Sequence, residues 1–456
     1  MGPDSGISGG HGTTIASIAS PPGVGALSIL RVSGPDAWAV AQRVTGNRPQ
    51  QPKPRHAHYC RVLDEQGRTI DDGLMTFFEA AHSHTGEPVV EFTGHGGILV
   101  GREVLARFLA CGAVHAAPGE FSRRAFLNVK LDLTQAEGVM DLIAAQTRLA
   151  MRAARAQLDG ALGRETSVAR DRLLETLAHL EAWIDFPEED IDPQSGEMLR
   201  AGLQQIVDQV DRLLATADQG RILREGVRTV IFGEPNVGKS SLLNRLLGFE
   251  RAIVSDLAGT TRDTIEEVIN LHGMPLRLVD TAGLRESEDA VEVAGIERTV
   301  RQVEGADLLL EVHDASRDAP SSVQAPASDA VHLRILNKSD LGEHPTWADV
   351  AAVRISCVDG AGFEALSTAI QEALKNAAHL DWGEQAVAIN VRHQSSLQNA
   401  RKHMLVASEL LGQSTLDPAL AAIELREALD ALGEIPGRVD TEDLLGVIFS
   451  RFCIGK

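Results

Sequence analysis

One stretch of the chain has the residue types and spacing of a phosphate-binding loop. The segment GEPNVGKS, Gly233–Ser240, matches G-x-x-x-x-G-K-[ST] in full and lies between an apolar run and a helical pattern. Its glycines allow backbone N–H groups to curve around phosphates. Lys239 would reach the β- and γ-phosphates, and the Ser240 hydroxyl would bind Mg²⁺. This strand–loop–helix context predicts a nucleotide site.

A second stretch, DTAGLRE at 280–286, raises the question whether the nucleotide is hydrolysed. Asp280 ends an apolar run and is placed to hold Mg²⁺ through a water, while the Gly283 N–H can meet a γ-phosphate. In the best-known GTPases a glutamine follows and orients the attacking water. Leu284 stands there instead, and it can neither donate nor accept a hydrogen bond. Either the chain does not hydrolyse nucleotide, or another group positions the water.

The segment NKSD, Asn337–Asp340, indicates which base is bound. An Asp at the end of a strand can accept the N1–H and 2-amino hydrogens of guanine, and adenine offers no such pair. The later segment ISC, Ile355–Cys357, would offer backbone N–H groups to the guanine O6. Cys357 stands where an alanine is usual, but a contact made through the backbone should tolerate it. The sequence therefore predicts guanine recognition.

The first nucleotide-sensing switch is expected in DLAGTTRDTIEE, Asp256–Glu267, between the phosphate loop and DTAG. Thr261 is the candidate for the second Mg²⁺-binding hydroxyl beside Ser240, ordered when a γ-phosphate is present. Thr260 is its nearest competitor.

The elements that must position these residues form an alternating β/α pattern over 226–379. Candidate strands are VRTVIFG, LRLVDTAG, ADLLLEVHD, VHLRILNKSD and AAVRIS, and this alternation is typical of a doubly wound, mostly parallel sheet. Residues 129–225 and 380–456 have helical patterns, so we expect one helical domain whose two parts flank the α/β domain in sequence. Residues 1–128 are mixed, with two β-runs near 13–32 and a helix at 98–110.

Composition excludes several classes of protein. Lys and Arg total 43 against 64 for Asp and Glu, a net charge of −21, so nucleic acid cannot be bound by bulk charge. The four scattered cysteines form no CxxC pair, which predicts a reduced, cytoplasmic protein without disulfides or a zinc ribbon. An apolar run of ~18 residues is missing, so we expect no membrane span. The segment before Thr13 lacks the basic and apolar regions of a signal peptide.

Together these motifs resemble the bacterial tRNA-modification GTPase family MnmE, also called TrmE. The resemblance rests on GEPNVGKSSLLN, DLAGTTRD, DTAGLRE with VEVAGIE, and the terminal FCIGK, and FTGHGG and PGEFSRRAFLNVKLDLTQAEGVMDLI extend it to the N-terminal part. It implies a multidomain fold. An α+β folate-binding and dimerisation domain would occupy 1–128, a discontinuous all-helical domain 129–225 and 380–456, and an inserted P-loop α/β GTPase domain 226–379.

The resemblance also implies a function. With a flavin-dependent partner, MnmG, such proteins add an aminomethyl or carboxymethylaminomethyl group to C5 of the wobble uridine of certain tRNAs. The one-carbon unit would come from 5-formyltetrahydrofolate or 5,10-methylenetetrahydrofolate. The chain would form a homodimer and contact tRNA mostly through its partner. A GTPase switch in ribosome assembly stays open as the alternative, although the acidic balance and the FCIGK tail weigh against it.

The resemblance offers an answer to the question raised by Leu284. Members of the family use K⁺ where other GTPases use an arginine finger, and a cation between the phosphates would offset charge developing in the transition state. The water-orienting glutamate of the family falls on Glu292, which by itself would be a first-turn helix acid. The expected K⁺ ligands are Asn236, Ser255, Leu257 and Thr260. The residues expected at GTP are Asn236, Val237, Gly238, Lys239, Ser240, Ser241, Ser255, Asp256, Leu257, Ala258, Gly259, Thr260, Thr261, Asp280, Thr281, Ala282, Gly283, Asn337, Lys338, Asp340, Ser356 and Cys357.

A folate pocket needs an acceptor for the pterin edge and cations for the glutamate tail. The family's folate residues fall on Arg31, Glu91, Lys130 and the terminal Lys456, each of which by itself is an ordinary exposed charge. Cys453 would lie near the folate. By itself it is a small buried apolar residue, and its part in the chemistry stays open.

Overall fold

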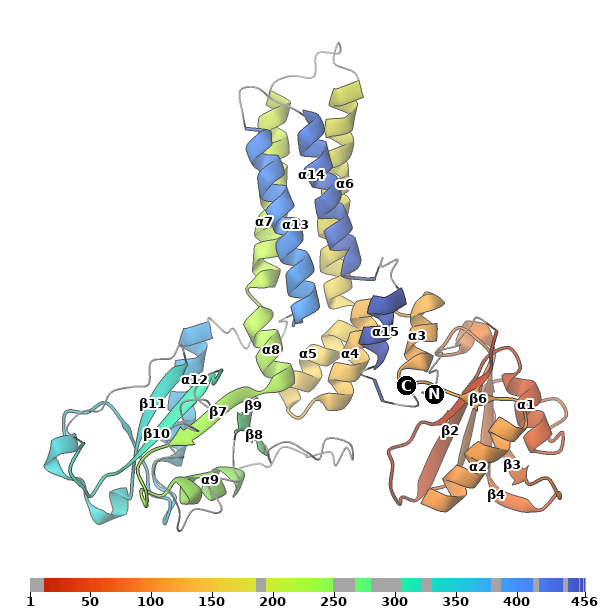
Figure 1. Cartoon of the computed structure of the whole chain (residues 1–456), viewed down its shortest axis with the longest axis horizontal. Helices are drawn as coiled ribbons and strands as arrows, with labels where there is room; N and C mark the ends of the chain where they lie inside the picture. Colours follow the sequence, from red (N-terminus) through yellow and green to blue (C-terminus); the bar gives the residue numbers. More distant parts are fainter. Residues whose placement is uncertain are drawn as a thin grey trace, which may run out of the picture. The chain divides into compact units, whose positions relative to one another are not determined.

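The computed structural model describes residues 12–185, 194–248, 267–279, 305–320, 330–378, 387–412, 418–437, 442–450, 452, 453 and 455. The chain divides into two compact units, Met1–Ala136 with Pro436–Lys456, and Glu137–Ile435. Figure 1 shows both units and labels most of their elements. Among the described residues, none of the helices is both long and apolar enough to cross a membrane.

The first unit is built on a six-stranded sheet. Its strands are β1 (Ile15–Ile18), β2 (Leu27–Ser33), β3 (Ala57–Leu63), β4 (Thr69–Phe78), β5 (Val89–His95) and β6 (Val114–His115), in the order β3-β4-β5-β2-β1-β6. All neighbours are antiparallel except β1 and β6. Helices α1 (Ala37–Val44) and α2 (Ile98–Ala110) pack with the buried sheet residues Leu30, Val32 and Phe92. The expected α+β fold and the helix at 98–110 are confirmed.

The end of the chain packs within this first unit. Helix α15 (Glu442–Ser450) contacts α3 (Glu120–Leu127), with the rings of Phe449 and Phe126 at 6.4 Å. A Cβ at Gly119, just before α3, would lie 2.5 Å from the Phe449 carbonyl oxygen. Residues 436–456 therefore group with the sheet, although in sequence they continue the second helical segment. The domain boundaries expected from the sequence stay predictions.

The helices before and after the GTPase segment share one core. Helices α6 (Ala161–Asp185) and α7 (Gln194–Leu214) pack with α13 (Val391–Leu410) and α14 (Pro418–Glu434), as Figure 1 shows. Their apolar residues recur at helical spacing and form one cluster that includes Leu173, Leu180, Val210, Met404 and Leu425. The discontinuous helical domain is thus confirmed. Three shorter helices adjoin this bundle: α4 (Leu133–Ala144), α5 (Arg148–Leu158) and α8 (Ala217–Glu225).

The GTPase segment forms a second six-stranded sheet. Its strands are β7 (Val227–Phe232), β8 (Glu267–Leu271), β9 (Met274–Leu278), β10 (Leu308–Asp314), β11 (Val331–Asn337) and β12 (Val353–Arg354), in the order β12-β11-β10-β7-β9-β8. Helices α9 (Lys239–Gly248) and α12 (Phe363–Ala378) contribute to its core. The sheet is parallel except for the β8–β9 hairpin. The expected α/β domain is confirmed, but β8 was not predicted.

A buried polar cluster joins α4 to α13 and to the end of α14. Glu137 accepts hydrogen bonds from Nε and Nη2 of Arg392, both at 3.0 Å, and lies 2.7 Å from Nε2 of the fully buried His393. Arg392 also donates to the carbonyls of Glu434 and Ile435. Burial alone would raise the pKa of Glu137, but His393 and Arg392 lower it to about 2. The carboxylate therefore stays ionised in the bundle.

Replacing Glu137 with glutamine should destabilise the helical domain by about 3–5 kcal/mol at neutral pH, because the variant leaves Arg392 without its buried partner. The folded pKa is about 2 and the ordinary value is 4.5, so this stabilisation is complete above pH 4.5 and is lost as the pH falls toward 2. The difference in urea unfolding free energy between wild type and variant should narrow over that range.

Glu181→Gln is the matched control, because Glu181 pairs with Arg426 at the surface and exposed pairs contribute only about 0–1 kcal/mol. Equal losses in the two variants, or a difference that persists unchanged to pH 2, would contradict the role given to the buried pair.

Candidate functional site

The phosphate-loop segment connects β7 to α9 with a backbone that requires its glycines. Gly233 has φ +146, and a Cβ there would lie 2.2 Å from the Val312 carbonyl oxygen. Gly238 has φ +97, and a Cβ there would lie 2.2 Å from Nδ2 of Asn337. Asn236 is left-handed, with φ +64. The loop therefore packs directly against β10 and β11, and only glycine at positions 233 and 238 permits so close an approach.

Lys239 lies over the mouth of this loop. Its Nζ donates to the carbonyl oxygens of Gly233 and Glu234, at 2.9 and 2.7 Å. Burial lowers the pKa of Lys239, because a desolvated ammonium is less stable. An anionic phosphate would reverse that penalty. Ser240 and Ser241 are exposed in the first turn of α9, where N–H groups favour anions.

Asn337 connects the two loops expected to hold GTP. Its side chain is 2% exposed, and its Nδ2 donates to the Val237 carbonyl at 2.9 Å. Its Oδ1 accepts from the Cys357 N–H at 3.2 Å. One buried amide thus fixes the phosphate loop relative to the segment at 355–357. The Cys357 N–H is engaged by Asn337, and its expected contact with guanine stays a prediction.

Lys338 is held by a residue that the sequence analysis missed. Its Nζ donates to the carboxylate of Asp314 at 2.7 Å and to the Asn236 carbonyl at 2.9 Å. Burial would raise the pKa of Asp314, but hydrogen bonds from Lys338 and Ser316 hold it below its usual range. The only sequence signal was the position of Asp314 at the end of a fully buried strand.

The guanine-side residues lie at the ends of β11 and β12. Asp340 is exposed in the short 3₁₀ helix η2 (Ser339–Leu341), and its expected contact with the base stays a prediction. Ser356 is fully buried, and its hydroxyl accepts from the N–H groups of Val358 and Asp359. Burial raises the pKa of the Cys357 thiol to about 11, so this side chain stays neutral.

Several expected site residues lie outside the described part of the chain. These are Ser255, Asp256, Leu257, Ala258, Gly259, Thr260, Thr261, Asp280, Thr281, Ala282, Gly283, Glu292 and Lys456. Leu284 is also among them. Their roles stay predictions.

The residues expected at a folate come together only in part. Arg31 and Glu91 are directly opposite on β2 and β5, and their side chains form an ion pair at 2.8 Å. The Arg31 guanidinium lies 5.7 Å from the centre of the Phe121 ring. Lys130 instead donates to the Ala81 carbonyl in η1 (Ala80–His82), at 2.8 Å.

The tail reaches the sheet that carries Arg31. The Cys453 carbonyl accepts from the Gly119 N–H at 3.4 Å. A Cβ at Gly455 would lie 2.4 Å from the Ile18 carbonyl oxygen, at the end of β1. Since β1 pairs Ser17 with Arg31, the half-buried Cys453 lies two residues before a glycine that packs on the neighbour of the Arg31 strand.

Sequence reasoning also missed a buried cluster around Arg124. Its guanidinium contacts the carboxylates of Glu87 at 3.0 Å and Glu120 at 2.8 Å, and donates to the Thr13 carbonyl at 2.7 Å. The signal was present, because Glu120 and Arg124 are one turn apart on α3. This cluster fixes α3 against the segments that precede β1 and β5, and α3 in turn packs against α15 in the tail.

Replacing Asp314 with asparagine should weaken GTP binding about tenfold, because Lys338 loses its charged partner and the Asn236 end of the phosphate loop loses its anchor. Asp318→Asn is the control, since Asp318 is exposed and its carboxylate pairs with His344 at the surface. Fluorescent-nucleotide titration measures both. Equal affinities for the two variants would contradict the anchoring role.

Two family models match the chain. The model described as "GTP-binding protein TrmE N-terminus" matches residues 14–130, and the "MnmE helical domain" model matches residues 133–453. A protein named tRNA modification GTPase MnmE from Akkermansia muciniphila is 50% identical, over 97% of this chain and 99% of the relative. Proteins of the same name from Aquifex aeolicus and Chloroflexus aurantiacus are 43% and 45% identical over the same shares.

Among solved structures, the FeoB G-domain from Methanococcus jannaschii is 27% identical, with a TM-score of 0.24 over 33% of this chain and 98% of that one. The two family models together cover most of the chain, and the relatives are similar over nearly its full length. The chain belongs to the MnmE (TrmE) family.

Proposed function

We propose that this protein hydrolyses GTP and, with a flavin-dependent partner, takes part in folate-dependent modification of tRNA. The product would be an aminomethyl or carboxymethylaminomethyl group at C5 of the wobble uridine. The observation that carries the proposal is 50% identity, over 97% of the chain, to a relative named tRNA modification GTPase. The phosphate loop with its guanine-side partners supports the GTP half.

The described loop fits a magnesium-bound triphosphate. Gly233 and Gly238 have positive φ values that curve the loop, and a loop of this kind can turn its backbone N–H groups toward phosphates. Lys239 supplies a desolvated cation, and the Ser240 hydroxyl with Thr261 would hold Mg²⁺. Bound Mg²⁺ would neutralise charge on the phosphate oxygens. Asp340 would accept the guanine hydrogens, and Asn337 holds the two loops in register.

For hydrolysis we propose that Glu292 orients water and that K⁺ replaces an arginine finger. Asn236 supports the cation role, because it is exposed on the loop, with left-handed φ and with its carbonyl fixed by Lys338. The remaining K⁺ ligands would come from Ser255, Leu257 and Thr260. Leu284 then needs no role in the chemistry.

Glu292→Ala should lower GTP turnover about hundredfold, as expected for loss of a water-positioning carboxylate, whereas Leu284→Ala should lower it much less. Phosphate release at constant ionic strength measures both. Wild type should turn over faster in K⁺ than in Na⁺, and Asn236→Ala should remove that preference. Equal losses of GTP turnover in Glu292→Ala and Leu284→Ala, with nucleotide binding intact, would contradict the role given to Glu292. Equal turnover rates of wild type in K⁺ and Na⁺ would contradict the role given to K⁺.

We propose that the Arg31–Glu91 pair and the tail frame a folate site, with Lys456 and Lys130 meeting the glutamate tail. Glu91 is 30% exposed and can accept hydrogens from a pterin edge, while Arg31 orients it. A reduced folate would supply the one-carbon unit. Cys453 is in the same tail segment as Lys456 and would lie near this folate.

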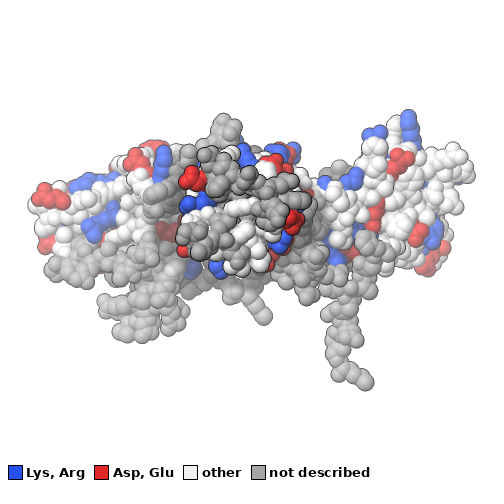
Figure 2. All heavy atoms as spheres, turned by 90° about the horizontal axis from the view of Figure 1, so that it is seen from above, with Lys and Arg blue, Asp and Glu red and all other residues white. Residues whose placement is uncertain are grey.

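We also propose a homodimer and a flavin-dependent partner. The sheet face that carries Arg31 exposes Ile29, Tyr59 and Leu74, and register places the last two opposite each other. A second copy could cover such an apolar face. On the face seen in Figure 2, Lys and Arg alternate with Asp and Glu rather than forming one patch. We propose that tRNA is contacted mostly through the partner, because the net charge of −21 disfavours direct binding of a polyanion, and that the complex acts in the cytoplasm.

The decisive test is nucleoside analysis of tRNA from cells that lack this protein. Loss of C5-modified wobble uridine is expected, with recovery on supplying wild type and no recovery with Glu91→Gln, since the amide cannot replace the acceptor pair. Glu79→Gln is the control, because Glu79 is an exposed residue of the same domain. Unchanged nucleosides in the deletion strain would overturn the proposal. Recovery with Glu91→Gln would overturn its folate half alone.

A further inference from the structure

The β8–β9 hairpin joins the two stretches expected to sense GTP. The first expected switch ends where β8 begins, at Glu267, and β9 ends at Leu278, just before Asp280. A displacement of either stretch therefore acts directly on this hairpin. Its turn packs against α5, since a Cβ at Gly273 would lie 3.0 Å from Cδ1 of Leu149.

The same hairpin packs against α8. Strand β9 contacts this helix, and a Cβ at Gly226, where α8 ends, would lie 3.2 Å from both the Pro275 carbonyl oxygen and Cβ of Arg277. Because interiors are close-packed, a shift of the hairpin must be taken up by α5 and α8.

Helix α8 is fastened on two sides by arginines one turn apart. Arg221 donates to both carboxylate oxygens of Asp307, which precedes β10, at 2.8 and 3.2 Å. Arg224 donates through Nη2 to the Ile389 carbonyl at 3.0 Å, in the segment that leads into α13. The first bond ties α8 to the GTPase sheet, and the second ties it to the helical bundle.

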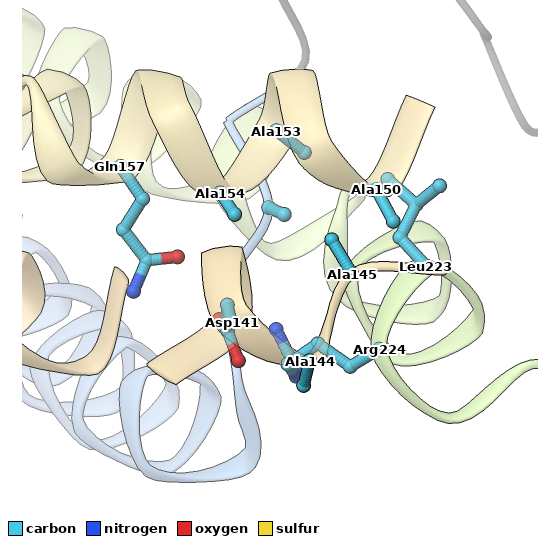
Figure 3. Close-up of a pocket in the computed structure, with 10 residues that line it drawn as sticks. Asp141, Ala144, Ala145, Ala150, Ala153, Ala154, Gln157, Leu223 and Arg224 are labelled. Atoms are coloured by element: carbon cyan, nitrogen blue, oxygen red, sulfur yellow. The ribbon is translucent and has the colours of Figure 1, made fainter. Parts of the chain in front are cut away.

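A small cavity lies where α4, α5 and α8 meet (Figure 3). Its volume is about 50 Å³, and alanines make up most of its lining: Ala144, Ala145, Ala150, Ala153, Ala154 and Ala388. Figure 3 shows the side chains of Asp141 on α4 and Arg224 on α8 directed toward one another there. Nη1 of Arg224 is buried and has no hydrogen-bond partner among the described residues. The pair forms no direct ion pair in this part of the chain.

Asp141 lies between a like charge, Glu137, and an opposite charge, Arg224. Glu137, one turn earlier on α4, takes the hydrogen bonds of Arg392 and His393. Burial and the charge of Glu137 raise the pKa of Asp141 to about 6, against the opposing effect of Arg224. Burial likewise lowers the pKa of Arg224. A direct bond between Asp141 and Arg224 would offset both costs, and the alanine-lined space leaves room for the helices to close.

We propose that Asp141 and Arg224 form a switchable ion pair, open in one nucleotide state and closed in the other, which couples the β8–β9 hairpin to α4 through α8. Helix α4 begins at Leu133, whose N–H donates to the Pro436 carbonyl at the start of the tail segment. Both residues act as positioning residues and touch no nucleotide. The inference rests on the proposed GTPase function, because it needs two nucleotide states.

Reciprocity gives the test. A contact that forms in only one nucleotide state changes the affinity for that nucleotide relative to the other. In the full-length protein, Asp141→Asn and Arg224→Gln should each change the ratio of the Kd for GDP to the Kd for a non-hydrolysable GTP analogue by about fivefold or more. The double variant should change it no more than one single variant does, because both remove one contact. Fluorescent-nucleotide titration in K⁺ provides the ratios.

Asp208→Asn is the control, since Asp208 is exposed on α7 and accepts a hydrogen bond from Gln204. Its ratio of the Kd for GDP to the Kd for the GTP analogue should equal that of wild type. An unchanged ratio in Asp141→Asn, or effects that add in the double variant, would overturn the switch. Asp141→Asn is nearly isosteric, so if Arg224→Gln does not fold, the Kd ratio of Asp141→Asn alone tests the switch. Failure of wild type to bind either nucleotide would instead overturn the proposed function.

Discussion

The buried amide of Asn337 is the interaction on which the nucleotide site depends. It accepts from the Cys357 N–H and donates to the Val237 carbonyl, and so holds the phosphate loop and the guanine-side loop at a fixed separation. Gly238 has to be glycine because a Cβ there would collide with this amide. A rigid nucleotide must meet both loops at once, so their spacing has to be set before binding. Lys338 and Asp314 extend the same constraint to Asn236.

The helical domain rests on a comparable buried interaction. Glu137 is matched by Arg392 and His393, and the carbonyls at the end of α14 take the remaining donors of Arg392. Asp141, one turn away, faces Arg224 across a small cavity without a direct bond. A buried ion pair whose hydrogen bonds are all made holds the helices in one arrangement. Two charged groups that face each other across open space, without a direct bond, allow the helices two arrangements.

Much of the fold could be predicted from the sequence, because alternating β/α segments and helical periodicity are local patterns. The hairpin strand β8 was missed because it lies on the sheet edge, where only two of its five residues, Ile269 and Leu271, are buried. The packing of residues 436–456 beside the first sheet also escaped prediction. It depends on contacts such as Phe449 with Phe126, between residues far apart in the chain.

The sequence by itself determined the phosphate loop, the guanine motif and the family, because each is written in contiguous residues whose chemistry follows from their order. Only the tertiary structure decided which charges meet. Arg31 faces Glu91 because β2 and β5 pair in one register, and a slip of one residue would put them on opposite faces. Asp314 and Arg124 likewise meet partners that are distant in the sequence, Lys338 and Glu87. Burial and long-range packing set their electrostatics, and neither is encoded in any short stretch of chain.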